Sequence, residues 1–129
     1  MSAPPITALI ADDEPHLRDY LQTRLARLWP QLQIVATAGN GVEALQQIRQ
    51  WQPDIVFLDI KMPGLTGLQV AQQAENCHCV FVTAYDQYAL RAFEQAAVDY
   101  LLKPVDEERL AQTVQRLQQR LAARAPAPV

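Results

Sequence analysis

Residues 7–14 read Thr-Ala-Leu-Ile-Ala-Asp-Asp-Glu, a short apolar run that ends in three acids. Four further apolar runs follow along the chain, at Gln33–Ala38, Ile55–Leu58, Val80–Val82 and Asp99–Leu102. These runs are short, rich in Ile, Val, Leu and Phe, and mostly continuous. Such a pattern is typical of strands that are buried on both faces of a parallel sheet.

The segments between these runs carry apolar residues at the spacing of amphipathic helices. Helices are expected at Leu17–Leu28, Val42–Trp51, Leu68–Ala74, Tyr88–Ala97 and Leu110–Leu121, with Asp106 as the N-cap of the last. Alternating strands and helices predict a doubly wound α/β fold: five parallel strands in the flavodoxin-like order 2-1-3-4-5, with five helices. In such a sheet, a ligand binds at the carboxyl ends of the strands, near the first and third.

Length and composition narrow the class of protein. The 129 residues suit one domain, and a chain with 50% hydrophobic and 19% charged residues is not expected to be disordered. The net charge of −3 disfavours direct binding to nucleic acid, which needs clustered cations. Without a signal peptide or a long apolar run, we expect a cytoplasmic protein that does not enter a membrane. Residues 1–124 are expected to form the domain, and Ala125–Val129 the start of a linker.

Acids, one hydroxyl group and one lysine follow four of the five predicted strands. Asp12, Asp13 and Glu14 come after the first strand, Asp59 after the third, Thr83 after the fourth and Lys103 after the fifth. Three acids in the first loop would repel a phosphate group unless a cation lay between them. Carboxylates from adjacent strands are the oxygen ligands that Mg²⁺ prefers.

This set of residues predicts phosphoryl chemistry. A carboxylate can act as a nucleophile and form an aspartyl phosphate. Lys103 supplies a cation for phosphoryl oxygens, and the Thr83 hydroxyl supplies a hydrogen-bond donor.

The chain resembles the receiver domains of bacterial response regulators. The resemblance rests on Ala8–Glu14, Asp54–Gly64, Val82–Ala84 and Asp99–Pro104, and it extends from about Ile6 to Ala123. It implies a signalling domain that takes a phosphoryl group from a sensor histidine kinase and does not act on outside substrates.

The same resemblance implies a role for individual residues. Asp59 would be the phosphoacceptor, and Lys103 would bind the phosphate. Mg²⁺ would be bound by Asp13, Asp59 and the backbone carbonyl of Lys61, and by Asp12 through water. Thr83 and Tyr100 would form a switch pair, and the bond between Lys103 and Pro104 would be cis.

Two longer stretches, Thr83–Glu94 and Val98–Val105, are similar to a narrower branch of the family. In that branch a DNA-binding output domain of the LytTR type follows the receiver, and the present chain contains no such domain. The sequence leaves open a stand-alone receiver that acts as a protein-binding adaptor. A phosphatase of the haloacid dehalogenase type is disfavoured because Lys61 stands where that family has a second Asp.

Two further features have alternative interpretations. Cys77-His78-Cys79 lacks the second ligand cluster of a zinc site, so we interpret it as a turn that enters a strand.

The fourth helix, fifth strand and fifth helix are expected to form a phosphorylation-dependent surface for a symmetric dimer. Its charged residues would be Arg91, Glu94, Asp99, Glu107 and Arg109.

Overall fold

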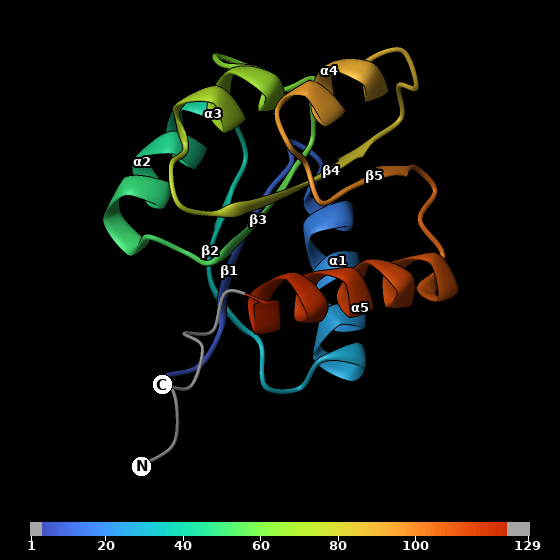
Figure 1. Cartoon of the computed structure of the whole chain (residues 1–129). Helices are drawn as coiled ribbons and strands as arrows, with labels where there is room; N and C mark the ends of the chain where they lie inside the picture. Colours follow the sequence, from blue (N-terminus) through green and yellow to red (C-terminus); the bar gives the residue numbers. More distant parts are fainter. Residues whose placement is uncertain (1–3, 124–129) are drawn as a thin grey trace.

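A computed structural model describes residues 4–123, in which five strands and five helices alternate (Figure 1). The strands are β1 (Thr7–Ala11), β2 (Gln33–Ala38), β3 (Ile55–Leu58), β4 (His78–Thr83) and β5 (Asp99–Leu102). The helices are α1 (Pro15–Leu28), α2 (Gly41–Trp51), α3 (Gly67–Gln73), α4 (Ala89–Glu94) and α5 (Glu107–Ala123). The expected linker at residues 125–129 lies outside the described residues.

All five strands are parallel and lie in the order β2-β1-β3-β4-β5. Helices α1 and α5 cover one face of the sheet, and α2, α3 and α4 cover the other (Figure 1). The predicted fold class and strand order are therefore confirmed.

Each face of the sheet has its own apolar core. Ile10, Phe57 and Val82 pack toward α1 and α5, whereas Leu9, Leu58 and Phe81 pack toward α2, α3 and α4. The alternation arises because successive side chains of a strand point to opposite faces. Burial on both faces explains why the central strands are continuously apolar in sequence.

Several elements differ in length from the prediction, β4 and α4 among them. β4 begins at His78 rather than Val80, because His78 pairs with Ile55 of β3. α4 covers only Ala89–Glu94, within the predicted Tyr88–Ala97. It ends where Ala96 takes a left-handed backbone conformation with φ of 59°.

Other local predictions are confirmed. The Oδ1 atom of Asp106 accepts a hydrogen bond from the backbone N–H of Arg109 at 2.7 Å, as an N-cap residue does. The peptide bond between Lys103 and Pro104 is cis. Among residues 4–123, no helix combines the length and apolar character needed to cross a bilayer.

Candidate functional site

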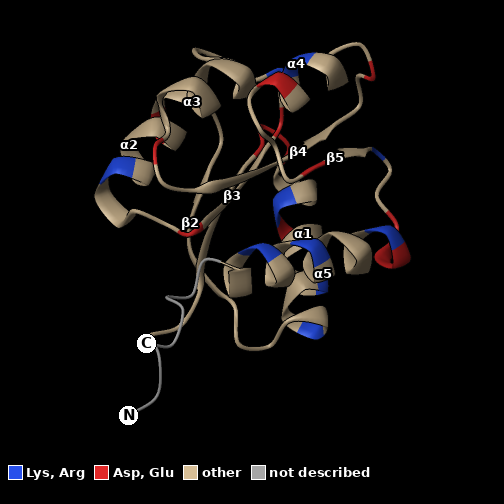
Figure 2. Ribbon diagram, viewed as in Figure 1, with Lys and Arg blue, Asp and Glu red and all other residues tan. Residues whose placement is uncertain are grey.

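Acidic side chains gather at the carboxyl edge of the sheet, where β1 and β3 end. Ala11 pairs with Leu58 in the parallel ladder, so Asp12 and Asp59 leave adjacent strands side by side. Carboxylate oxygens of Asp12, Asp13, Glu14 and Asp59 all lie within 4.8 Å of one another. Asp12 and Asp59 are buried, whereas Asp13 and Glu14 are exposed. Figure 2 shows acidic residues at this edge, while basic residues lie mainly on α1 and α5.

Lys103 is the cation at the centre of this cluster. Its Nζ lies 3.0 Å from Asp12 Oδ2, 3.0 Å from Asp59 Oδ2 and 3.1 Å from Glu14 Oε1. Burial alone would lower the pKa of Lys103, but hydrogen bonds and charge interactions with Asp12 and Asp59 raise it overall. The lysine therefore stays charged at every physiological pH.

Asp59 presents one carboxylate oxygen to Lys103 and the other to the backbone. Its Oδ1 atom accepts a hydrogen bond from the N–H of Ile60 at 2.7 Å, which fixes the plane of the carboxylate. Gly67 begins α3 against the same residue, and a Cβ atom at position 67 would lie 2.0 Å from the Asp59 carbonyl oxygen. Only glycine therefore allows α3 to approach the end of β3 this closely.

Asp12 lies in an environment that disfavours its charge. Its pKa is raised to about 6, mainly by burial and in part by the nearby charge of Asp59. The Glu14 N–H, which donates to Asp12 Oδ1 at 2.8 Å, and Lys103 act in the opposite direction. The cluster thus holds four carboxylates, three of which contact the Lys103 ammonium group, and this excess of oxygen donors and negative charge fits a bound Mg²⁺ ion.

Thr83 and Tyr100 lie at the same edge of the sheet. The Thr83 hydroxyl is fully buried and has no hydrogen-bond partner among the described residues. Tyr100 lies opposite Phe81 on β4, and its hydroxyl donates a hydrogen bond to the backbone carbonyl of Tyr85. The loop after β4 is thereby tied to β5 at the position of the predicted switch pair.

Lys61 also contacts the loop after β4. Its Nζ lies 4.5 Å from the centre of the Tyr85 ring, a cation–π contact, and Tyr85 packs edge-on against Tyr88. Both Lys61 and Tyr85 are exposed. The proposed role of the Lys61 carbonyl as a metal ligand stays a prediction.

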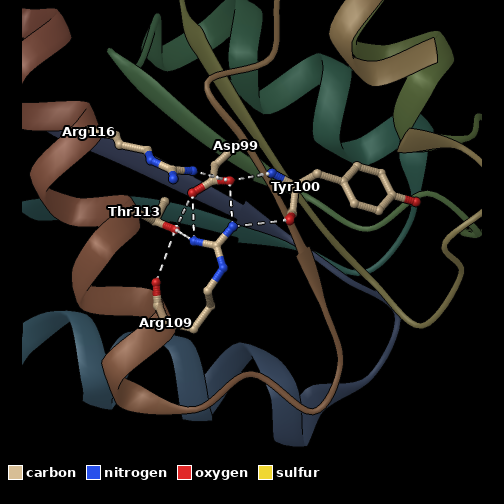
Figure 3. A network of polar contacts seen from close by, with 5 residues as sticks. All are labelled: Asp99, Tyr100, Arg109, Thr113 and Arg116. Carbon is tan, nitrogen blue, oxygen red and sulfur yellow. Dashed lines mark hydrogen bonds and ion pairs between the residues drawn. The ribbon is translucent and has the colours of Figure 1, made fainter. Parts of the chain in front are cut away.

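Asp99 differs from the expectation that its charge belongs to an exposed surface. The side chain is buried, and its carboxylate is bonded to Arg109 at 2.9 and 2.7 Å, Arg116 at 2.8 Å and Thr113 at 2.8 Å (Figure 3). Burial alone would raise the pKa of Asp99, but the bonds from Arg109, Thr113 and the Tyr100 N–H lower it overall. This network fastens α5 to β5.

The other charged residues of the expected dimer surface divide into two groups. Glu107 lies 3.8 Å from Arg24 and 3.6 Å from Arg27, so it pairs with α1. Arg109 is engaged by Asp99. Arg91 and Glu94 remain exposed on α4, as expected.

Two polar contacts near the site were not anticipated from the sequence. An Arg18 guanidinium nitrogen donates to the backbone carbonyl of Asp12 at 2.6 Å, and the Tyr20 hydroxyl donates to the carbonyl of Val105 at 2.6 Å. Both residues lie on α1 and fix the loops after β1 and β5. The contact between Arg18 and Asp12 had a signal in the sequence, because Arg18 lies in the first turns of the helix that follows the acidic loop.

Cys77 and Cys79 are free thiols at the start of β4. Cys79 is buried between the sheet and its helices, and Cys77 is half-buried. Neither belongs to a group of three or more potential metal ligands within residues 4–123. The structure therefore agrees with the prediction that this segment is a turn that enters a strand.

The fold and the acidic edge together define a receiver-like signalling domain. The profile of the Response regulator receiver domain family matches residues 8–115, and the chain belongs to this family.

Relatives and solved structures agree with this assignment. The chain is 56% identical over 119 residues to an uncharacterised response regulatory protein of Vibrio cholerae, covering 89% of this chain and 46% of the relative. It is 44% identical over 117 residues to the transcriptional regulatory protein BtsR of Escherichia coli, covering 88% of this chain and 48% of BtsR. The chain thus spans about half the length of these relatives.

Among solved structures, the REC domain of AraT from Geobacillus stearothermophilus matches with a TM-score of 0.87 and 32% identity, over 95% of this chain and all of that one. The response regulatory domain of mrkE from Klebsiella pneumoniae matches with a TM-score of 0.86 and 31% identity, over 92% of this chain and all of that one.

Proposed function

We propose that this protein acts in the cytoplasm, where Asp59 accepts a phosphoryl group from a sensor histidine kinase. The observation that carries the proposal is the position of Asp59 Oδ2, 3.0 Å from the Lys103 ammonium group and within the four-carboxylate cluster. In the reaction, an Asp59 oxygen forms a bond to phosphorus as the bond between phosphorus and the donor nitrogen breaks. Lys103 then stabilises the charge on the phosphoryl oxygens.

The residues that would bind Mg²⁺ are Asp13, Asp59 and the Lys61 carbonyl, with Asp12 acting through water. When bound, the ion offsets repulsion between the carboxylates and the incoming phosphoryl group. The chain itself supplies the nucleophile, the Lys103 cation and the Thr83 hydroxyl, whose buried oxygen has no other partner among the described residues. A phosphoryl oxygen could accept the hydrogen bond that this hydroxyl can donate.

Phosphorylation with a small donor tests the proposal directly. The chain is incubated with acetyl phosphate and Mg²⁺, and intact mass spectrometry measures the addition of one phosphoryl group. We expect stoichiometric, hydroxylamine-sensitive phosphorylation of the native chain and none of Asp59→Asn. Normal phosphorylation of Asp59→Asn would place the acceptor elsewhere.

We further propose that phosphorylation controls an output domain through a symmetric receiver dimer. Relatives about twice as long, including a transcriptional regulatory protein, support an attached output domain, for which a LytTR-type DNA-binding domain is our candidate. In this proposal DNA is bound by the output domain and not by the receiver. The dimer surface consists of exposed residues of α4 and β5, and Thr83 and Tyr100 link it to Asp59.

A further inference from the structure

Lys103 contacts one carboxylate more than the proposed phosphoryl transfer requires. Asp12 and Asp59 come from the ends of β1 and β3, whereas Glu14 stands immediately before α1. All three carboxylates lie at nearly equal distances from Lys103 Nζ, 3.0, 3.0 and 3.1 Å. The lysine side chain is 13% exposed and that of Glu14 is 64% exposed. Glu14 therefore approaches the lysine from the solvent side.

The backbone of Glu14 is fixed while its side chain is not. Its N–H donates to Asp12 Oδ1 at 2.8 Å, and its carbonyl accepts from the N–H groups of Leu17 and Arg18 at 3.1 and 3.2 Å. The side chain makes no capping bond to α1, although Glu14 occupies the N-cap position. The contact with Lys103 can thus break without disturbing the start of the helix.

A phosphoryl group on Asp59 would change the balance of charge around Lys103. A phosphoryl group brings roughly −1.5 to −2 charges and strong acceptor oxygens. Glu14 and Asp59 carboxylate oxygens lie within 4.8 Å of each other, so Glu14 would repel that group and compete with it for the same ammonium. Exposure to water makes Glu14 the carboxylate that can leave most easily.

We propose that Glu14 is a positioning residue that holds Lys103 in the unphosphorylated state and releases it when Asp59 carries a phosphoryl group. The contact keeps the ammonium group over Asp59 before the reaction and opposes the approach of anionic phosphoryl donors. The proposal rests on the proposed phosphorylation of Asp59 and concerns the regulation of that same site.

The lysine side chains give a direct readout because Lys61 and Lys103 are the two lysines of the sequence. Protein labelled with ¹³C and ¹⁵N in lysine would show two side-chain signals, assigned with Lys61→Arg. Without metal or donor, Glu14→Gln is expected to shift the Lys103 signal and leave the Lys61 signal nearly unchanged. Asp19→Asn, which removes an exposed acid of α1, is the matched control and should move neither signal.

The same spectra with Mg²⁺ and beryllofluoride test the release. In that state the Lys103 signals of the native chain and Glu14→Gln should coincide, because Glu14 no longer contacts the lysine. A Lys103 signal that is identical in both proteins before addition would overturn the proposal. A difference that persists unchanged with beryllofluoride would also overturn it, since Glu14 would then not release the lysine.

Reaction kinetics separate this role from metal binding. Glu14→Gln should lower the acetyl phosphate concentration for half-maximal rate by about three- to tenfold, because one repelling charge is removed. Mg²⁺ affinity should fall by less than about threefold. A loss of Mg²⁺ affinity well beyond this, with an unchanged Lys103 signal, would make Glu14 a metal ligand and overturn the proposal.

Different experimental outcomes would contradict the role of Glu14 and the proposed phosphorylation of Asp59. If the native chain is phosphorylated on Asp59 but Glu14→Gln matches it in spectra and kinetics, only the role of Glu14 is wrong. If the native chain takes no phosphoryl group and beryllofluoride leaves its Lys103 signal unchanged, the proposed function fails and the role of Glu14 with it.

Discussion

Arg109 binds both carboxylate oxygens of Asp99, at 2.9 and 2.7 Å, and so fastens the first turns of α5 to the start of β5. Such a two-pronged pair is geometrically specific, and removing one partner of a buried pair is strongly destabilising. We expect Asp99→Asn to lower the free energy of unfolding by about 2–4 kcal/mol. Urea unfolding at pH 7 measures the loss, with the exposed Arg120→Gln of the same helix as the control, expected to change stability by less than about 0.5 kcal/mol.

The contribution of Asp99 should depend on pH in a defined direction. Its pKa is lowered in the folded state from the usual value of 3.8, so the folded protein favours the charged form more than the unfolded chain does. The stabilisation is complete above the unfolded pKa and disappears as pH falls through the lower folded value. Native and Asp99→Asn proteins should therefore converge in stability in strong acid; an equal difference at pH 7 and in strong acid would contradict this explanation.

Asp12 should have the opposite effect on stability. Burial raises its pKa to about 6, so the folded state binds a proton more tightly than the unfolded chain between about pH 4 and pH 6. Stability from this group is lost as pH rises through that window. At pH 7.5 in EDTA, Asp12→Asn should raise the free energy of unfolding by about 1–3 kcal/mol.

The gain from Asp12→Asn should shrink as pH falls toward 4, where the native carboxyl is protonated. In the same variant, Mg²⁺ affinity should fall because a negative charge is removed from the proposed metal site. A variant that is less stable than the native chain at pH 7.5 without metal would refute the charge argument. Thermal unfolding followed by circular dichroism, at several pH values without metal and then with increasing Mg²⁺, measures the stability gain and the loss of Mg²⁺ affinity.

Tyr85 should control the lifetime of the phosphorylated protein. Its ring lies against the ammonium group of Lys61, which is two residues beyond Asp59 in the sequence. We expect this ring to cover the direction from which water must approach phosphorus in line. Tyr85→Ala removes this cover and should shorten the lifetime several-fold, whereas Tyr85→Phe keeps the ring and should preserve it. Loss of phosphate from purified phosphoprotein, followed by intact mass, measures the rate. An unchanged or longer lifetime in Tyr85→Ala would rule out shielding.

The acidic site was predictable because each of its residues follows a strand, and parallel strands end at the same edge. Asp12, Asp59 and Lys103 are brought together by this rule alone. The burial of Asp99 was not predicted, because an acid at the first position of a strand gives no sign of a partner on a helix. Arg109, Thr113 and Arg116 recur at helical spacing, and only the packing of α5 shows that this face meets Asp99.

The ends of α4, which was predicted as the longer segment Tyr88–Ala97, were missed for a related reason. Its start at Tyr88 has no side-chain cap, and apolar residues continue past its end, so the sequence shows neither boundary. The structure also changes the character of the expected dimer surface. With Asp99, Glu107 and Arg109 engaged within the domain, exposed apolar side chains rather than charge pairs dominate α4 and β5.

These apolar side chains are Leu90 at 71% exposure, Phe93 at 64% and Leu102 at 49%. Leu90 and Phe93 lie three residues apart on α4 and therefore share one face of that helix, and large exposed apolar side chains of this kind indicate a protein interaction site. Phosphorylation would draw the Thr83 hydroxyl toward Asp59 and bias the loop that Tyr100 holds through Tyr85. We therefore expect the phosphorylated chain to form a symmetric dimer through α4 and β5.

Sedimentation of the beryllofluoride-bound chain at several concentrations tests this dimer. Phe93→Asp should weaken dimerisation at least tenfold, because it places a charge in the apolar contact, whereas Trp51→Gln on α2 should leave it unchanged. Arg91 and Glu94 lie exposed around the same patch, and across a two-fold axis one can face the other. Reversing either charge should weaken the dimer, and reversing both should restore it. A chain that stays monomeric with saturating beryllofluoride, or an Asp59→Asn variant that dimerises equally well, would show that this surface does not report phosphorylation.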